Sequence, residues 1–218
     1  MNKAFRLLLG LSLSFAALAV RADVQAPDVQ APDALIRETA DEVLAAVKQD
    51  KDLRAGNQKK LLELVEAKVL PHFDFEKMTR LALGVPWRQA TAEQRQALVS
   101  EFRTLLVRTY TAAFSRYQDQ KVEVKPAVLN PKKPDEATVN TQIVKPGSQP
   151  IAVVYKLSKK DTGWKVFDLY VDGASLVAAY NGTFAEEVQK GGIDGLIKTL
   201  AGKNRTNAAE PINKAGHK

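Results

Sequence analysis

One ten-residue stretch, WKVFDLYVDG at residues 164 to 173, constrains the fold of this chain more than any other segment. Successive side chains of a β-strand point to opposite faces, and a strand of a small antiparallel sheet usually has one apolar and one polar face. Here both faces are apolar. The large side chains on one face are Trp164, Val166 and Tyr170, and those on the other are Phe167, Leu169 and Val171. The pattern predicts apolar material against both sides of this strand.

Four consecutive segments alternate between apolar and polar residues, and sequences rich in Pro, Gly, Asp and Lys separate them. Such segments, joined by short turns, predict an antiparallel meander. The third segment, PIAVVYKLSKK, also has apolar residues on both faces. The four predicted strands cover residues 121–129, 137–145, 150–160 and 163–173.

Apolar residues recur at intervals of three and four on both sides of these strands, which predicts helices. The helical segments cover residues 33–47, 57–70, 73–84, 91–117 and 174–202. The residues expected to start, end or break them are Asp33, Pro71, Gly84, a Thr91–Gln94 capping box, Gly182 and Gly191–Gly192. The order predicts an α+β fold in which a helical layer packs against a curved four-stranded antiparallel sheet.

Large apolar side chains are numerous for elements of this size. A tightly packed core accounts for most of them, but it accounts poorly for a strand that is apolar on both faces. An apolar cavity between the sheet and the helices would account for that strand. We therefore expect such a cavity.

The N-terminus has the pattern of a secretory signal peptide. Basic Lys3 and Arg6 precede an apolar run from Leu7 to Val20, and small residues near Ala22 suit a signal peptidase. The run is shorter than the roughly 20 residues that span a bilayer. We expect cleavage after Ala22. The predicted divisions are a signal peptide at 1–22, a flexible lead-in at 23–32, one domain at 33–202 and a disordered tail at 203–218.

The composition argues against several kinds of site. The chain has no cysteine and two histidines, His72 and His217, so disulfides, thiol catalysis, histidine triads and multi-histidine metal sites are excluded. The glycines at 191–195 lack the spacing of a phosphate-binding loop. The formal net charge of +7 is spread along the chain without a basic cluster, which argues against nucleic-acid binding. We expect neither a metal nor a cofactor.

Asp168 and Asp172 are the strongest candidates for catalysis. A carboxylic acid inside an apolar cavity could shuttle a proton. The structural interpretation is stronger, because Asp172 precedes Gly173 and suits a turn, while Asp168 suits a hydrogen-bonded position at the edge of the sheet. A small cavity enzyme that acts on a hydrophobic substrate through Asp168 is the alternative to a non-catalytic binding protein.

Two blocks of the sequence carry a resemblance to a known family. The first is LALGVPWRQATAEQRQALVSEFRTLLVRTYTAAF, residues 81–114, and the second is WKVFDLYVDGASLVAAYNGTFAEEVQKGGIDGLIKTL, residues 164–200. In these blocks the chain resembles the MlaC family of periplasmic phospholipid-binding proteins, also called toluene-tolerance auxiliary components. The similarity runs from about residue 35 to residue 202, nearly the whole predicted domain.

The resemblance implies a nuclear-transport-factor-like architecture in which the acyl chains of a glycerophospholipid lie in the cavity and the headgroup is exposed. It implies a periplasmic carrier, not an enzyme, whose phospholipid is cargo. Its expected partners are an outer-membrane lipoprotein–porin complex and the MCE-domain ring of an inner-membrane ABC transporter. Such a carrier maintains outer-membrane lipid asymmetry. We expect a monomer that does not bind nucleic acid.

The resemblance also directs attention to individual residues. We expect the lipid cavity to be lined by Leu81, Leu83, Trp87, Leu105, Tyr110, Val153, Phe167, Leu169, Val171 and Tyr180. The chain departs from its relatives at Val85–Pro86, where they carry a basic and an aromatic residue, and at Asn181, where they carry an arginine. Contact with the headgroup or a partner is therefore expected from Arg80, Arg88 or Lys165.

Overall fold

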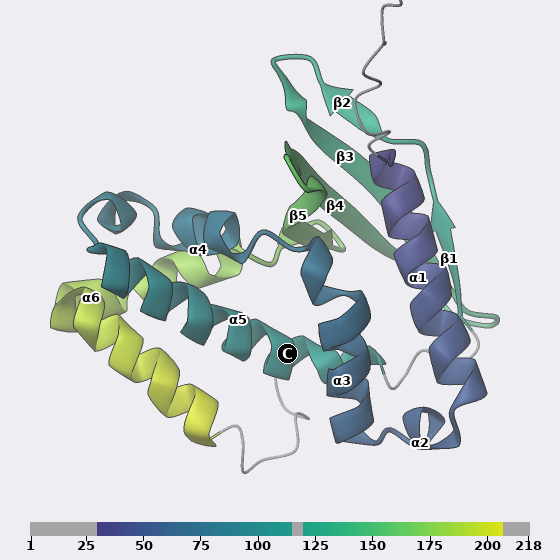
Figure 1. Ribbon diagram of the computed structural model, residues 1–218, viewed down its shortest axis with the longest axis horizontal. Coiled ribbons are helices and arrows are strands. Elements are labelled where there is room, and N and C mark those ends of the chain that lie inside the picture. Colours follow the sequence, from purple (N-terminus) through teal and green to yellow (C-terminus); the bar gives the residue numbers. More distant parts are fainter. Residues whose placement is uncertain (1–29, 115–119, 207–218) are drawn as a thin grey trace, which may run out of the picture.

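The computed structural model describes residues 30–114 and 120–206. The predicted signal peptide, most of the lead-in and residues 207–218 of the predicted tail lie outside this part of the chain. Six strands form one curved sheet, with helices on both of its sides (Figure 1). No helix in the described ranges has the length and apolar character needed to cross a bilayer.

Three helices precede the rest of the fold. They are α1 (Pro32–Gln49), α2 (Lys51–Arg54) and α3 (Gln58–Lys68). Asp50 and Asn57 cap α2 and α3 through their side chains. The predicted cap of α1 at Asp33 was wrong: Ala31 is the cap, and Asp33 lies in the first turn. Pro32 explains the earlier start, because its fixed φ suits the first helical position and it needs no amide partner there.

A second helical group follows. It comprises η1 (Leu70–His72), α4 (Phe75–Leu83), η2 (Val85–Arg88) and α5 (Ala92–Phe114). Gly84 ends α4 as predicted, with a φ of 67° that side chains other than glycine rarely adopt. The predicted capping box is also confirmed. The Thr91 amide donates to Gln94 Oε1 at 3.1 Å, and the Gln94 amide donates to Thr91 Oγ1 at 3.2 Å.

The sheet contains the predicted meander with two short additions. Its strands are β1 (Lys121–Val124), β2 (Val128–Asn130), β3 (Lys133–Val144), β4 (Ile151–Lys160), β5 (Gly163–Val171) and β6 (Ala174–Ser175). All pair antiparallel, in the order β1-β3-β4-β5-β6, and β2 pairs with β3. The prediction of a single first strand was wrong. The chain leaves the ladder around Pro126, which has no amide to donate, and returns as β2.

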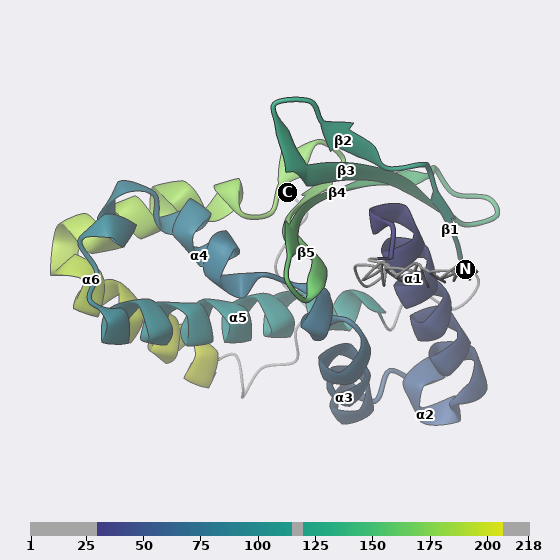
Figure 2. The same cartoon turned by 45° about the horizontal axis from the view of Figure 1, so that its top comes forward.

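The sheet arches over α1, which lies on its concave side (Figure 2). Pairing identifies the residues of this concave face. Val139 lies opposite Tyr155, and Ala137 lies opposite Leu157. Ala137, Val139 and Leu157 form a buried cluster with Leu35 and Ile36 of α1.

A β-bulge in β5 answers the question raised by its two apolar faces. Lys156 lies opposite Asp168 and Leu157 lies opposite Val166, so Phe167 is the extra residue. A bulge shifts the alternation by one position. Trp164 and Val166 therefore share the concave face with Leu169 and Val171. The simple two-residue alternation had assigned these two pairs to opposite faces.

The chain ends in η3 (Ala178–Tyr180) and α6 (Asn181–Thr206). Gly192, with a φ of 65° and a ψ of −171°, divides α6 into two helical pieces, which confirms the predicted break there. Gly182 causes no break, since it lies in the first turn of α6. Lys203–Thr206 are helical and continue α6 beyond residue 202.

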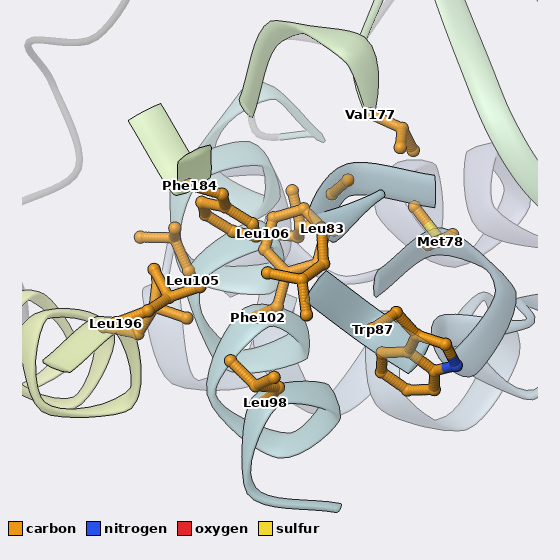
Figure 3. Close-up of a cluster of buried hydrophobic side chains, with 12 residues drawn as sticks. Met78, Leu83, Trp87, Leu98, Phe102, Leu105, Leu106, Val177, Phe184 and Leu196 are labelled. Carbon is orange, nitrogen blue, oxygen red and sulfur yellow. The ribbon is translucent and has the colours of Figure 1, made fainter. Parts of the chain in front are cut away.

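Among the residues that the structure describes, the buried apolar side chains form three clusters. The largest joins α4, α5 and α6 around Phe102 (Figure 3). The second joins Leu35 and Ile36 of α1 to the concave face of the sheet, and Phe73 packs against both of these clusters. The third joins α1, α2 and α3 through Val47, Leu53 and Leu61.

Candidate functional site

The concave face carries an apolar surface that α1 leaves partly uncovered. Across β4 and β5, Val153 lies opposite Val171, and Tyr155 lies opposite Leu169. Ile151 precedes Val153 on the same face. Val171 is 42% exposed and Ile151 is 39% exposed, which is unusual for large apolar side chains beside a buried cluster. We call Ile151, Val153, Tyr155, Leu169 and Val171 the concave patch.

Four buried valines belong to none of the three clusters formed by the described residues. They are Val43 of α1, Val65 of α3, Val107 of α5 and Val153 of β4. A domain of this size usually buries its apolar side chains in one contiguous core. Here one cluster lies mainly among α4, α5 and α6, and a separate one joins α1 to the concave face.

Two tyrosines join α5 to η3. Tyr110 and Tyr180 interact through their hydroxyl groups, and Thr109 is a further partner of Tyr180. Burial raises the pKa of the Tyr180 hydroxyl above its usual range, and Tyr110 raises it further. The ring of Tyr180 packs edge-on against Phe102, with centroids 5.0 Å apart. Both predicted tyrosines therefore lie together, with Tyr110 partly exposed.

The ten residues predicted to line a cavity do not form one group. Val153, Leu169 and Val171 lie together in the concave patch. Leu83, Trp87 and Leu105 are buried in the cluster of α4, α5 and α6 (Figure 3). Because most members of this cluster lie on helices, these three side chains stabilise the helical layer.

Leu81 and Phe167 line a different feature, a pocket of about 400 Å³ on the convex side of the sheet. Its other walls include Lys156, Asp168 and Tyr170, which face away from α1. The lining is therefore part apolar and part charged. This distinguishes the convex pocket from the concave patch.

The three predicted cations lie at separate places. The Lys165 ammonium group donates to the Pro71 carbonyl at 2.7 Å and lines a second pocket of about 480 Å³. Arg80 and Arg88 are exposed on α4 and η2. The Arg88 carbonyl accepts a hydrogen bond from Arg95, which holds η2 against α5.

Asp168 has the structural role that its sequence position suggested. Its Oδ1 accepts hydrogen bonds from the Leu169 and Val177 amides at 2.8 and 3.1 Å, and its Oδ2 accepts one from the Ser175 hydroxyl at 2.7 Å. Asp172 adopts a φ of 48° in the turn after β5 and accepts a hydrogen bond from the Ala152 amide. Both carboxylates hold the end of the sheet together.

Asn181 caps the end of α4. Its Nδ2 donates to the carbonyls of Leu81 and Ala82, each at 2.9 Å. These are among the last carbonyls of a helix, which have no partner inside it. The side chain thus joins the start of α6 to the end of α4.

The predicted cavity lining did not include Ile151, Tyr155 or the valines of α1, α3 and α5. Alternation in β4 was the available signal for Ile151 and Tyr155, because it places them on the face of Val153. The helical valines carried no comparable signal. No group of three or more His, Asp or Glu side chains suited to a metal occurs among residues 30–114 and 120–206.

Comparison with known proteins places these features in context. The family model described as MlaC protein matches residues 37–202. The intermembrane phospholipid transport system binding protein MlaC of Haemophilus influenzae is 25% identical over 186 residues, which cover 83% of this chain and 84% of the relative. Toluene tolerance protein Ttg2D of Pseudomonas putida is 27% identical over 196 residues, covering 89% of this chain and 86% of the relative.

A solved structure is similar over most of the fold. It is the phospholipid-binding protein from Ralstonia solanacearum in complex with a phospholipid. The two chains are 36% identical with a TM-score of 0.74, over 82% of this chain and 99% of the other.

Proposed function

This chain belongs to the MlaC family, and we propose on that premise that it is a periplasmic phospholipid-binding transport protein. One observation carries the proposal: a 36% identical structure of the same fold was obtained in complex with a phospholipid. The concave patch, of which Ile151 and Val171 are exposed, supplies a suitable apolar surface in this chain.

The acyl chains contact the concave patch and the four valines outside the clusters. Burying a methylene group stabilises by about 0.8 kcal/mol, so two chains of about 16 carbons gain on the order of 20 kcal/mol relative to water. No charged group is needed to hold them. A bilayer stabilises the chains by nearly the same amount, so transfer between carrier and membrane is close to neutral in free energy.

The phosphate headgroup remains in water, where exposed cations stabilise it only modestly. The carrier exchanges phospholipid with an outer-membrane lipoprotein–porin complex and with the MCE-domain ring of an inner-membrane ABC transporter. Periplasmic location follows from membership of the family and agrees with the signal-peptide pattern at residues 1–22. This exchange maintains the lipid asymmetry of the outer membrane.

Proton transfer by Asp168 has less support. Both of its carboxylate oxygens accept hydrogen bonds from its own chain, and its side chain faces the convex pocket, not the concave patch. These bonds occupy all but about one of the roughly four lone-pair sites of the carboxylate. The interactions of Asp168 are those of a structural residue.

The test is native mass spectrometry of the protein purified from the periplasm, followed by lipid extraction and identification. A complex with stoichiometric phospholipid is the expected result. An empty protein that stays empty after incubation with phospholipid vesicles would overturn the proposal.

A further inference from the structure

The β2–β3 hairpin exposes two large apolar side chains at the edge of the sheet. Val128 is 59% exposed and Leu129 is 54% exposed. Val128 lies opposite Thr138 and Leu129 lies opposite Ala137, so they point to opposite faces of the hairpin. The hairpin projects away from the helices (Figure 1). Exposed apolar residues at a sheet edge usually indicate an interaction surface.

Lysines flank this apolar pair without intervening acidic residues. The segment KPAVLNPKK, residues 125–133, contains Lys125, Lys132 and Lys133 and no Asp or Glu. All three lysines are exposed. Lys133 pairs with Glu136 at 3.6 Å, and Lys77 holds the same carboxylate at 3.0 Å, which leaves Lys125 and Lys132. Most of the positive charge at the hairpin is therefore available to an anionic partner.

The neighbouring hairpin adds to the positive charge. Glu136 near the start of β3 lies opposite Ser158 near the end of β4, so the β2–β3 and β4–β5 turns lie at the same end of the sheet. The second turn carries the exposed Lys159 and Lys160, of which Lys160 pairs with Asp74. Asp135 and Asp161 reduce the local charge but leave it positive.

Pairing of β2 with another strand is disfavoured. The strand has only three residues, and Pro126 and Pro131 lie on either side of it. Proline cannot donate a ladder hydrogen bond and protects sheet edges from pairing. An apolar pair flanked by lysines, on a projecting hairpin that resists strand pairing, suits a lipid surface better than a protein strand.

We propose that the β2–β3 hairpin contacts the surface of an anionic phospholipid bilayer. The hairpin meets the membrane with its turn, so that Val128 and Leu129 enter the interface between headgroups and acyl chains from its two faces. Lys125 and Lys132 contact lipid phosphates. Ile151 and Val171 lie at the opposite end of the strands from this hairpin. The contact therefore retains the carrier at a membrane while leaving the concave patch free. It goes beyond cargo binding and does not depend on it.

The test is co-sedimentation of the full-length mature protein with vesicles of phosphatidylcholine alone or mixed with phosphatidylglycerol. Wild type should sediment with the mixed vesicles and much less with the neutral ones, and added salt should weaken the binding. The charge variant is K125Q/K132Q, and its control is K198Q/K203Q on α6. Each hairpin lysine contributes about fivefold to vesicle affinity. The charge variant should therefore bind at least about tenfold more weakly than its control.

The apolar variant is V128S/L129S, and its control is V85S on η2, where Val85 is 73% exposed. Loss of binding in the hairpin variant, with V85S unchanged and both melting like wild type, is the expected result. If V128S/L129S does not fold, the charge pair decides the outcome. Equal binding by the hairpin variants and their controls would overturn the proposal, as would wild type that binds neither kind of vesicle.

Two further measurements separate the alternatives. Analytical ultracentrifugation without vesicles detects self-association through β2. Membrane contact would be refuted if wild type forms a dimer that V128S/L129S does not form and if wild type does not bind vesicles. Mass spectrometry of bound phospholipid should give the same occupancy in hairpin variants and wild type. Vesicle binding by a protein without bound lipid would support this inference while refuting the proposed function.

Discussion

The Ser175 hydroxyl donates a hydrogen bond to Asp168 Oδ2 at 2.7 Å and thereby joins β6 to the bulged strand β5. The same carboxylate accepts hydrogen bonds from the Leu169 and Val177 amides. Asp168 is buried, so these bonds replace water at a charged group. The turn between β5 and η3 depends on this single side chain.

Removing Asp168 should therefore lower stability much more than removing Ser175. Asp168→Ala leaves two amides and a hydroxyl without their acceptor, and we expect a loss of about 3 kcal/mol in the free energy of unfolding. Ser175→Ala removes two hydrogen bonds, the one donated to Asp168 and the one accepted from the Ala178 amide at 2.9 Å. Water can replace the second bond because it is exposed, so the cost should be about 1 kcal/mol. Urea titration followed by circular dichroism measures both. Equal stability of Asp168→Ala and wild type would reopen a functional role for this carboxylate.

Replacing Val171 by glutamate should prevent lipid binding without unfolding the protein. The side chain is 42% exposed, so the fold tolerates a charge there, but an acyl chain cannot cover an ionised carboxylate. We expect at least about tenfold less phospholipid to co-purify with Val171→Glu. Val85→Glu, which places the same charge on η2, is the control. Full lipid occupancy in Val171→Glu would contradict the assignment of the concave patch.

The Lys77–Glu136 ion pair connects α4 to β3 at 3.0 Å, and both side chains are mostly buried. Burial acts to raise the pKa of Glu136, but the hydrogen bonds and charges of Lys77 and Lys133 together outweigh it and hold the pKa below its usual value. The stabilisation is therefore present above the ordinary value of 4.5 and is lost as the pH falls through the folded-state pKa.

Glu136→Gln tests whether the stability of the protein depends on pH through the ionised Glu136. The variant should be less stable than wild type by about 1–2 kcal/mol near neutral pH, and the difference should shrink as the pH falls below 4.5. Urea titrations across this range measure it. Glu63→Gln, at an exposed position of α3, is the control and should match wild type throughout. A difference for Glu136→Gln that does not vary with pH would contradict the linkage.

Gly192 and Gly191 provide a matched pair in α6. Gly192 adopts a φ of 65° and a ψ of −171°, a conformation essentially restricted to glycine, so Gly192→Ala should cost about 1–3 kcal/mol. Gly191 has no such φ, and an added methyl group would meet no atom within 4 Å. Gly191→Ala should be neutral or stabilising by up to about 1 kcal/mol. Thermal unfolding compares the melting temperatures of the two variants. Equal changes in melting temperature would argue against a helix break at Gly192.

Local signals predicted local structure well. The Thr91–Gln94 capping box and the glycine stop at Gly84 involve residues close together in the chain, so their hydrogen bonds and dihedral angles follow from short segments. The long strands were predicted for the same reason. The bulge at Phe167 could not be, because it is defined by the pairing of β5 with β4.

The candidate site shows the same limit. Alternation grouped Leu169 with Val171, but it could not show that Val166 and Trp164 join them beyond the bulge. Periodicity identified Leu83, Trp87 and Leu105 as apolar helix positions without identifying their partners, which are other helices. Family resemblance suggested a lipid, while the positions of these side chains depended on tertiary packing.

The division of the buried residues into three clusters affects how the protein unfolds. Clusters with few shared side chains can open separately, so the empty protein should lose structure in stages and show several classes of amide hydrogen exchange. A bound phospholipid that contacts both the sheet and the helices would make the three clusters unfold together in one cooperative transition. The sharpness of thermal unfolding would then report how much of the carrier is loaded.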